Sequence, residues 1–226
     1  MTVYDIAATL PPIEVLRDRC KALAVLERII DGGEPYYAYT RRWGDDEAAL
    51  MDNGSGDEWT VVFTTAGAFI RVFDHESAMS PYRDPHHDLW TGLLDGIPSA
   101  FRPLIEEPAF GDEEGLFVAT AVLWRLSSDD RWHAGEGITF PPLRGPHGDN
   151  DPDGAGLLEI LLDDIVDRYV EFAEDYYRIE VDPRVVEHVV TYRPLTDAVV
   201  QALNPEVTVG RLREDIAAIG YPIAAA

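Results

Sequence analysis

Histidines and carboxylates stand close together in several short segments, and these residue types could bind a metal ion. Asp74 and His75 follow an apolar run, and His86 and His87 precede a segment predicted to be a short helix. Imidazole nitrogens and carboxylate oxygens suit borderline metals, and ligands often lie where a strand passes into a loop. The spacing matches no ligand motif, so hydrogen bonding and helix capping are the alternative interpretation.

A second acidic segment, residues 149–154, has the sequence D-N-D-P-D-G and fits the opening of a calcium loop. Asp149, Asp151 and Asp153 would surround the cation, and the glycine would permit the sharp turn. The pattern fails further on, because the twelfth position is Ile160 instead of the bidentate glutamate of an EF-hand. Asp153 has an alternative role as an acidic residue near the N-terminus of the next helix.

No motif for nucleophilic catalysis or nucleotide binding occurs in the sequence. The patterns G-x-S-x-G, G-x-G-x-x-G and G-x-x-x-x-G-K-[ST] are all absent. Cys20 is the only cysteine and stands in an apolar helical stripe, which predicts a buried thiol. We therefore predict no catalytic residue and no cofactor.

The charge of the chain is strongly negative, with 42 Asp and Glu against 18 Lys and Arg and a net charge of -24. A surface of this sign repels nucleic acid and anionic membranes, so general binding to either is excluded. Residues 105–182 contribute -15 of this charge, from 20 acidic residues and five arginines. This region is either a solvated surface or one that attracts a basic protein. The candidate partner-binding residues lie on a predicted amphipathic helix and are Asp163, Asp164, Asp167, Glu171, Glu174 and Asp175.

The pattern of apolar residues and turn residues predicts an α+β fold. A leading helix is expected to end at Asp31-Gly32-Gly33 and to precede an antiparallel meander of four to six strands. Helices are expected to follow the sheet and to pack on it. The predicted strands are Tyr36–Trp43, Ala48–Met51, Glu58–Thr64, Ala68–Phe73, Leu116–Leu126 and Arg131–Ala134. The predicted later helices are Leu89–Leu94, Ser99–Ile105, Leu157–Tyr177, Asp197–Leu203 and Val209–Ile219.

We expect residues 1–226 to form a single domain, with a Gly- and Pro-rich loop at 135–156 between a β-rich and a helical part. The first ten residues lack the basic and apolar regions of a secretory signal, and no apolar run is long enough to span a membrane. A cytoplasmic protein with no membrane contact is therefore expected, and its oligomeric state stays open.

Several segments together resemble an uncharacterised family of proteins from high-GC Gram-positive bacteria. The segments that carry the resemblance are Gly54–Asp57, Ala66–Phe69, Phe73–Ser77, Asp95–Pro98, Asp130–His133, Phe172–Tyr177, Arg193–Thr196 and Ile219–Pro222. That family has no assigned activity, so the resemblance implies no site residue. The order of the elements is also similar to that of SMI1/KNR4-type immunity proteins, a likeness of architecture that does not establish function.

Three hypotheses about function follow. The first is a non-enzymatic acidic protein, toxin-neutralising or regulatory, that binds a basic protein by electrostatic attraction. The second is a metal-assisted hydrolase that uses Asp74, His75, His86 and His87. The third is a small-ligand module with an aromatic pocket, whose candidate wall residues are Trp43, Trp59, Trp90 and Trp124.

Overall fold

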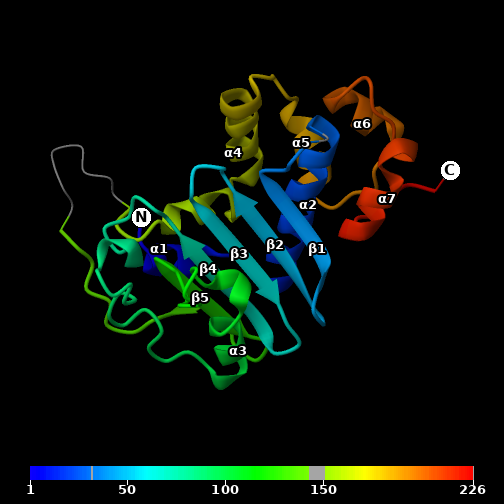
Figure 1. Cartoon of the computed structure of the whole chain (residues 1–226). Coiled ribbons are helices and arrows are strands. Elements are labelled where there is room, and N and C mark those ends of the chain that lie inside the picture. Colours follow the sequence, from blue (N-terminus) through cyan, green and yellow to red (C-terminus); the bar gives the residue numbers. More distant parts are fainter. Residues whose placement is uncertain (32, 143–150, 226) are drawn as a thin grey trace. The chain divides into compact units, whose positions relative to one another are not determined.

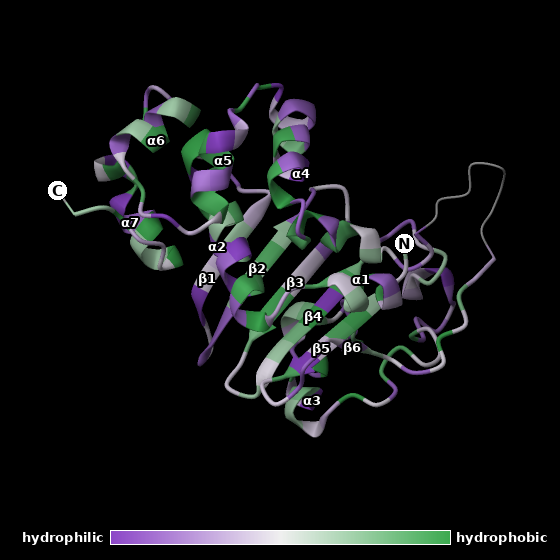
Figure 2. Cartoon of the chain, turned by 180° about the vertical axis from the view of Figure 1, so that it is seen from behind, coloured by the Kyte–Doolittle hydropathy of each residue, from purple (hydrophilic) through white to green (hydrophobic). Residues whose placement is uncertain are grey.

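The computed structural model describes residues 1–31, 33–142 and 151–225. Six strands form one sheet in the order β1-β2-β3-β4-β5-β6. The pairs β1–β2, β3–β4, β4–β5 and β5–β6 are antiparallel, and the strands are labelled in Figures 1 and 2. The strands are β1 (Tyr37–Trp43), β2 (Asp46–Asp52), β3 (Glu58–Phe63), β4 (Gly67–Phe73), β5 (Ala121–Leu126) and β6 (His133–Ala134). The predicted α+β fold with an antiparallel meander is confirmed.

Helices precede and follow these strands along the chain. The α-helices are α1 (Val3–Thr9), α2 (Ile13–Ile30), α3 (Arg102–Ile105), α4 (Ile165–Phe172), α5 (Pro183–Val190), α6 (Asp197–Leu203) and α7 (Val209–Ile219). The shorter helical segments are η1 (Pro81–Arg83), η2 (Ser99–Phe101), η3 (Pro108–Phe110), η4 (Ala155–Leu161) and the π-helical turn η5 (Ala173–Tyr177). Throughout the described ranges, every helix is too short or too polar to cross a lipid bilayer.

The chain is divided between two compact parts. The first part comprises Met1–Ile13 and Asp52–Glu159, and the second part comprises Glu14–Met51 and Ile160–Ala226. The sequence does not mark this division with a linker, because each part is assembled from two separate stretches of the chain.

The core of the first part is formed by β3, β4 and β5 together with α1. Every residue of β4 is buried, as expected for a strand that is apolar at nearly every position. The register sets Ile70 opposite both Val61 and Leu123. Trp132 anchors the N-terminal segment, because its indole Nε1 donates a hydrogen bond to the Pro11 carbonyl over 2.8 Å.

The core of the second part contains α2 and the helices after residue 160. Purple and green residues both occur on α4 and α5 in Figure 2, as expected for helices with one apolar face. Cys20 of α2 is buried, and burial raises the pKa of its thiol, as predicted for an inert core cysteine. α7 contacts β1 and ends at Gly220, whose φ of 79° is the left-handed conformation typical of a helix C-terminus.

Two of the predicted helices were wrong in detail. Residues 89–94 do not form a helix: the chain makes a turn at residues 91–96, where Gly92 has a φ of 89° and lies close to the Glu136 carbonyl. The predicted Leu157–Tyr177 helix is divided into η4, α4 and η5. The division falls at Asp163 and Asp164, where Asp164 occupies the N-cap position of α4.

Candidate functional site

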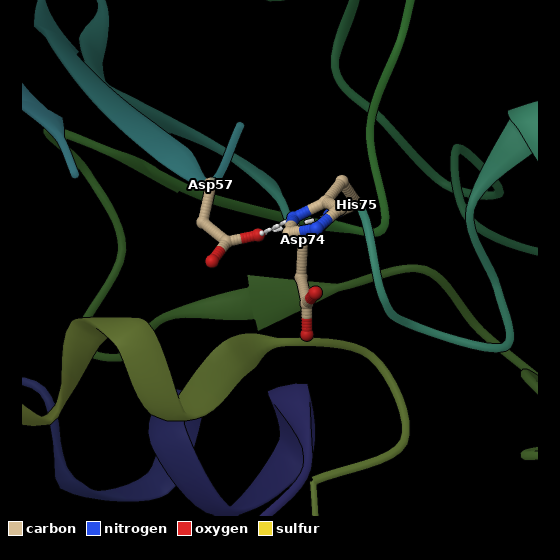
Figure 3. A group of neighbouring side chains, drawn as sticks. All are labelled: Asp57, Asp74 and His75. Carbon is tan, nitrogen blue, oxygen red and sulfur yellow. Dashed lines mark hydrogen bonds and ion pairs between the residues drawn. The ribbon is translucent and has the colours of Figure 1, made fainter. Parts of the chain in front are cut away.

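Asp57, Asp74 and His75 lie together at one end of the β3–β4 pair, in the first part of the molecule (Figure 3). Glu58 begins β3 and pairs with Phe73, the last residue of β4. This register sets the next residue outward on each strand, Asp57 and Asp74, across from each other. One ligand atom from each of the three side chains lies within 4.8 Å of the other two.

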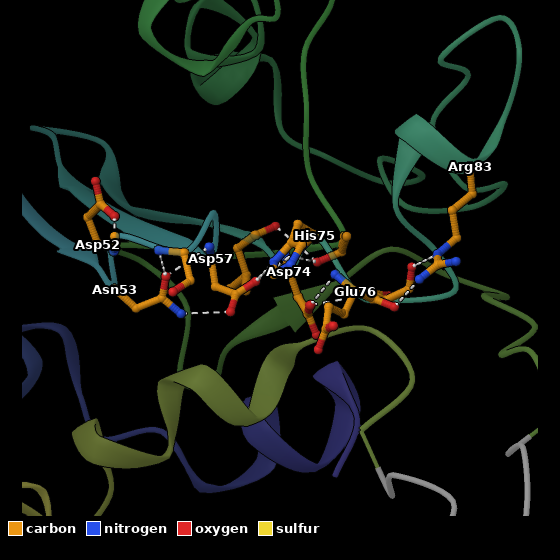
Figure 4. Close-up of polar contacts among 12 residues, drawn as sticks. Asp52, Asn53, Asp57, Asp74, His75, Glu76 and Arg83 are labelled. Atoms are coloured by element: carbon orange, nitrogen blue, oxygen red, sulfur yellow. Dashed lines mark hydrogen bonds and ion pairs between the residues drawn. The ribbon is translucent and has the colours of Figure 1, made fainter. Parts of the chain in front are cut away.

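The imidazole of His75 is oriented by Asp57. The Nδ1 atom of His75 lies 2.6 Å from Oδ1 of Asp57, and the His75 backbone N–H donates to the same oxygen over 3.0 Å. Asn53 donates to the other carboxylate oxygen over 2.7 Å (Figure 4). Burial acts to raise the pKa of Asp57, but the hydrogen bonds from His75 and Asn53 outweigh it and lower the pKa. The Asp57 hydrogen bond raises the pKa of His75.

Asp74 closes the turn that leads out of β4 and packs on the loop that contains Gly154. Its Oδ1 accepts hydrogen bonds from the backbone N–H groups of Glu76 and Ser77, over 2.8 and 3.1 Å. A Cβ atom on Gly154 would lie 2.4 Å from the Asp74 Cβ, so only glycine permits this approach. Burial raises the pKa of Asp74, and the neighbouring Asp57 charge acts in the same direction.

The segment that contains Asp74 and the segment that contains Asp151 are far apart in the sequence but line the same cavity. Asp57, Asp74, Glu76 and Asp151 all line one cavity of about 390 Å³. The Asp151 Oδ2 accepts a hydrogen bond from the Gly156 N–H over 2.8 Å. Its Oδ1 is buried and receives no N–H donor from the described residues, and the Asp151 side chain forms a hydrogen bond with the neighbouring Asp153 carboxyl group. Burial raises the pKa of Asp151. The cavity wall therefore gathers carboxylates from segments far apart in the sequence.

Asp153 is fully buried beside Asp151 and holds the N-terminus of α1. Its Oδ2 accepts from the Val3 N–H over 2.8 Å, and its Oδ1 accepts from the Ala155 N–H over 3.2 Å. Burial, reinforced by the Asp151 charge, raises the pKa of Asp153 to about 7. Asp153 thus accepts from the first N–H of the segment that follows it, η4, as the sequence predicted, and it also satisfies the first N–H of α1.

The structure does not bring His86 or His87 into this group. His87 pairs instead with Asp112, whose Oδ2 lies 2.9 Å from its Nδ1. Adjacent residues on a turn diverge, and His86 is exposed while His87 has a φ of 55°. The third predicted calcium ligand, Asp149, lies outside the described residues.

The predicted partner-binding carboxylates are all exposed and lie in the second part, on or just before α4 and η5. Asp163 forms an ion pair with Arg19 and Asp164 with Arg168, both over 2.7 Å. The remaining four form no ion pair with any described residue, and these are Asp167, Glu171, Glu174 and Asp175. We call these four residues the acidic stripe, because their spacing repeats approximately every turn of a helix.

An aromatic cluster, which the sequence did not predict, supports the acidic stripe. Tyr176 is 54% exposed and stacks on Phe172, with ring centroids 5.4 Å apart and an interplanar angle of 12°. Tyr36 and Tyr177 contact the Tyr176 ring edge to face. The buried Glu27 carboxylate holds this cluster by accepting hydrogen bonds from the Tyr169 and Tyr177 hydroxyls, over 3.0 and 2.7 Å.

The tryptophans do not converge on one pocket. Trp59 and Trp124 are buried in the core of the first part, and Trp43 ends β1 in the second part. Trp90 lines a separate cavity that is described below. Comparisons of the chain with protein-family models, with curated proteins and with solved structures found no match.

Proposed function

We propose that the protein is a non-enzymatic binding protein that holds a basic protein partner on the acidic stripe. The observation that carries this proposal is the exposed Tyr176 beside four exposed carboxylates that no described cation neutralises. A toxin-neutralising or regulatory role in the cytoplasm would use such a surface.

The physical case rests on charge and on pre-organisation. Exposed carboxylates on a chain with a net charge of -24 accelerate the approach of a basic partner and repel polyanions. A tyrosine held by neighbouring rings loses little conformational freedom on binding, and tyrosines are enriched among residues that dominate binding energy. Tyr176 would therefore serve as the anchor, and the stripe would select the charge of the partner.

The experiment compares two variants that carry the same loss of charge. The first replaces the acidic stripe with amides (Asp167→Asn, Glu171→Gln, Glu174→Gln and Asp175→Asn). The matched control replaces four exposed carboxylates elsewhere (Glu106→Gln, Glu113→Gln, Glu114→Gln and Glu206→Gln). Each protein, with all 226 residues, is used to capture basic proteins from lysate, and the captured protein is then titrated in pure form.

We expect the dissociation constant to rise at least tenfold for the stripe variant and for Tyr176→Ala, and to stay within about twofold for the control. Binding should weaken as salt increases, because charge attraction is screened. An equal loss of affinity in both charge variants would show non-specific attraction and would overturn the proposal. The proposal would also be overturned if no captured protein bound saturably.

One observation favours a second candidate function, metal-assisted hydrolysis with Asp74 and His75 as ligands and Asp57 as the residue that orients His75. Asp57 accepts from Nδ1 of His75, which leaves Nε2 for a metal, an arrangement common in metal sites. The Asp151 carboxylate on the cavity wall that Asp57 and Asp74 line adds a further ligand candidate. A bound divalent ion would lower the pKa of a coordinated water and so supply a nucleophile.

Metal binding is tested by equilibrium dialysis and melting temperature at about pH 8 with zinc, manganese and calcium. We expect one equivalent to bind to the wild-type chain and to be lost in Asp74→Asn. His87→Ala is the matched control, since His87 has the same aspartate pairing but no third ligand residue beside it within the described ranges. Less than 0.2 equivalents of every metal, or equal binding by all three proteins, would refute this second function.

A further inference from the structure

A cavity of about 600 Å³ lies in the first part of the molecule, beside η1 and the turn at residues 91–96. Its volume falls within the range of small-molecule pockets. Met79, Leu89 and Trp90 supply apolar wall, and Ser80, Asp84 and Asp88 supply polar groups. None of these residues belongs to the acidic stripe or to the Asp57–Asp74–His75 group.

Ser80 supplies an observation that points to a ligand. The residue is only 3% exposed, and its Oγ is buried without a hydrogen-bond partner among the described residues. Buried hydroxyls almost always have a partner, so an unsatisfied one in a cavity wall suggests that the occupant of the cavity supplies it. The Ser80 backbone is held in place, because its N–H donates to the Ser77 carbonyl over 3.1 Å.

The charged groups of the wall favour a cation. Asp84 and Asp88 are exposed carboxylates on the wall. Arg83 also lies on the wall, but its guanidinium donates to the backbone carbonyls of Glu76 and Ser77 (Figure 4). The two carboxylates outnumber the one guanidinium of the wall, so the charged groups of the wall sum to a negative charge, and the strongly negative chain concentrates cations near its surface.

Trp90 supplies the aromatic surface that organic cations prefer. Its indole Nε1 donates to the Thr139 carbonyl over 3.0 Å, which fixes the ring in the wall, and the residue is partly exposed. Trp is the best aromatic partner of an ammonium group. We propose that this cavity binds a small organic cation, in which an ammonium group lies against Trp90 near the two carboxylates and a hydroxyl or amine hydrogen-bonds to Ser80.

The test uses choline as the probe and the uncharged carbon isostere of choline as its matched control. Both are titrated into the full chain by calorimetry and by ligand-observed NMR at low salt. We expect saturable choline binding, and binding of the isostere at least tenfold weaker, since the isostere keeps the hydroxyl and loses the charge. Equal binding of the two, no saturation by about 10 mM choline, or preference for acetate would overturn the proposal.

Variants locate the site. Trp90→Leu should weaken choline binding at least tenfold and Asp88→Asn about threefold, whereas Trp43→Leu, a partly exposed tryptophan away from the cavity, should have no effect. Ser80→Ala should weaken choline binding without lowering the melting temperature of the free protein, because it removes a hydroxyl that makes no hydrogen bond to any described residue. A Ser80→Ala protein that binds choline normally would overturn the role of Ser80, and equal effects of the two tryptophan variants would overturn the site.

Discussion

The paired carboxyl groups of Asp151 and Asp153 predict an unusual dependence of stability on pH. Asp153 is fully buried, and burial with the Asp151 charge raises its pKa from 3.8 to about 7 in the folded protein. A carboxyl group whose folded-state pKa exceeds its unfolded-state value stabilises the fold fully below the unfolded-state pKa. That contribution is lost as pH rises through the folded-state pKa. The pair should therefore stabilise the protein in acid and cease to do so above neutral pH.

The perturbation is Asp151→Asn. The asparagine oxygen can still accept from the Gly156 N–H, and its amide N–H can donate to the Asp153 carboxylate. The repulsion between two charges then disappears, but burial, the larger cause of the raised pKa, remains, so the pKa of Asp153 should fall only part of the way from about 7 toward its ordinary value. Because each pKa unit corresponds to about 1.4 kcal/mol, the wild-type chain should lose roughly 1 kcal/mol relative to Asp151→Asn between about pH 5 and pH 8.

The assay is urea unfolding at intervals across that range, with a chelator present so that no metal contributes. The control is Asp167→Asn, which removes one exposed carboxylate that has no ion pair with a described residue. We expect its profile to run parallel to that of the wild-type chain. If the Asp151→Asn profile is also parallel, or if wild-type stability rises relative to it with pH, the two carboxyl groups do not share a proton.

Two further predictions concern stability and are measured by urea unfolding. Gly67→Ala should destabilise by more than about 3 kcal/mol, because its φ is 150° and the new Cβ would lie 2.1 Å from a backbone oxygen of β5. Gly54→Ala, with a φ of 70° and open space, should cost only about 1 kcal/mol of strain, and equal effects would contradict the packing argument. Tyr177→Phe should cost about 2 kcal/mol, because the buried Glu27 carboxylate loses a hydrogen-bond donor. Tyr176→Phe should be neutral, and a similar cost for both would contradict the role assigned to Glu27.

Asp57 was not among the predicted metal ligands, and its place beside Asp74 and His75 follows from the pairing of β3 with β4. The predicted strands and their Ala66-Gly67 turn were sufficient to infer the register that sets Asp57 across from Asp74. Neither segment taken by itself indicates this pair, because the two residues are 17 positions apart in the sequence. Asp151 could not be found in this way, because its approach to Asp74 depends on a loop contact that no local pattern encodes.

Two helices escaped prediction although their capping residues were present. Thr2 and Asp5 form a capping box at the start of α1, and Asp182 with Pro183 begins α5. Both helices are short, so their apolar periodicity is too brief to detect, and their stability depends on tertiary packing.

By itself the sequence determined the α+β class, the antiparallel meander, the buried thiol and the excess of negative charge. These properties depend on composition and on the periodicity of neighbouring residues, both of which are local. Only the tertiary structure decided which carboxylates are paired by arginines and which histidine meets two aspartates. It also decided that a buried serine hydroxyl in a cavity wall has no partner in the part of the chain that the structure describes. Such relations arise between residues far apart in the chain, and they exist only after folding has brought those residues together.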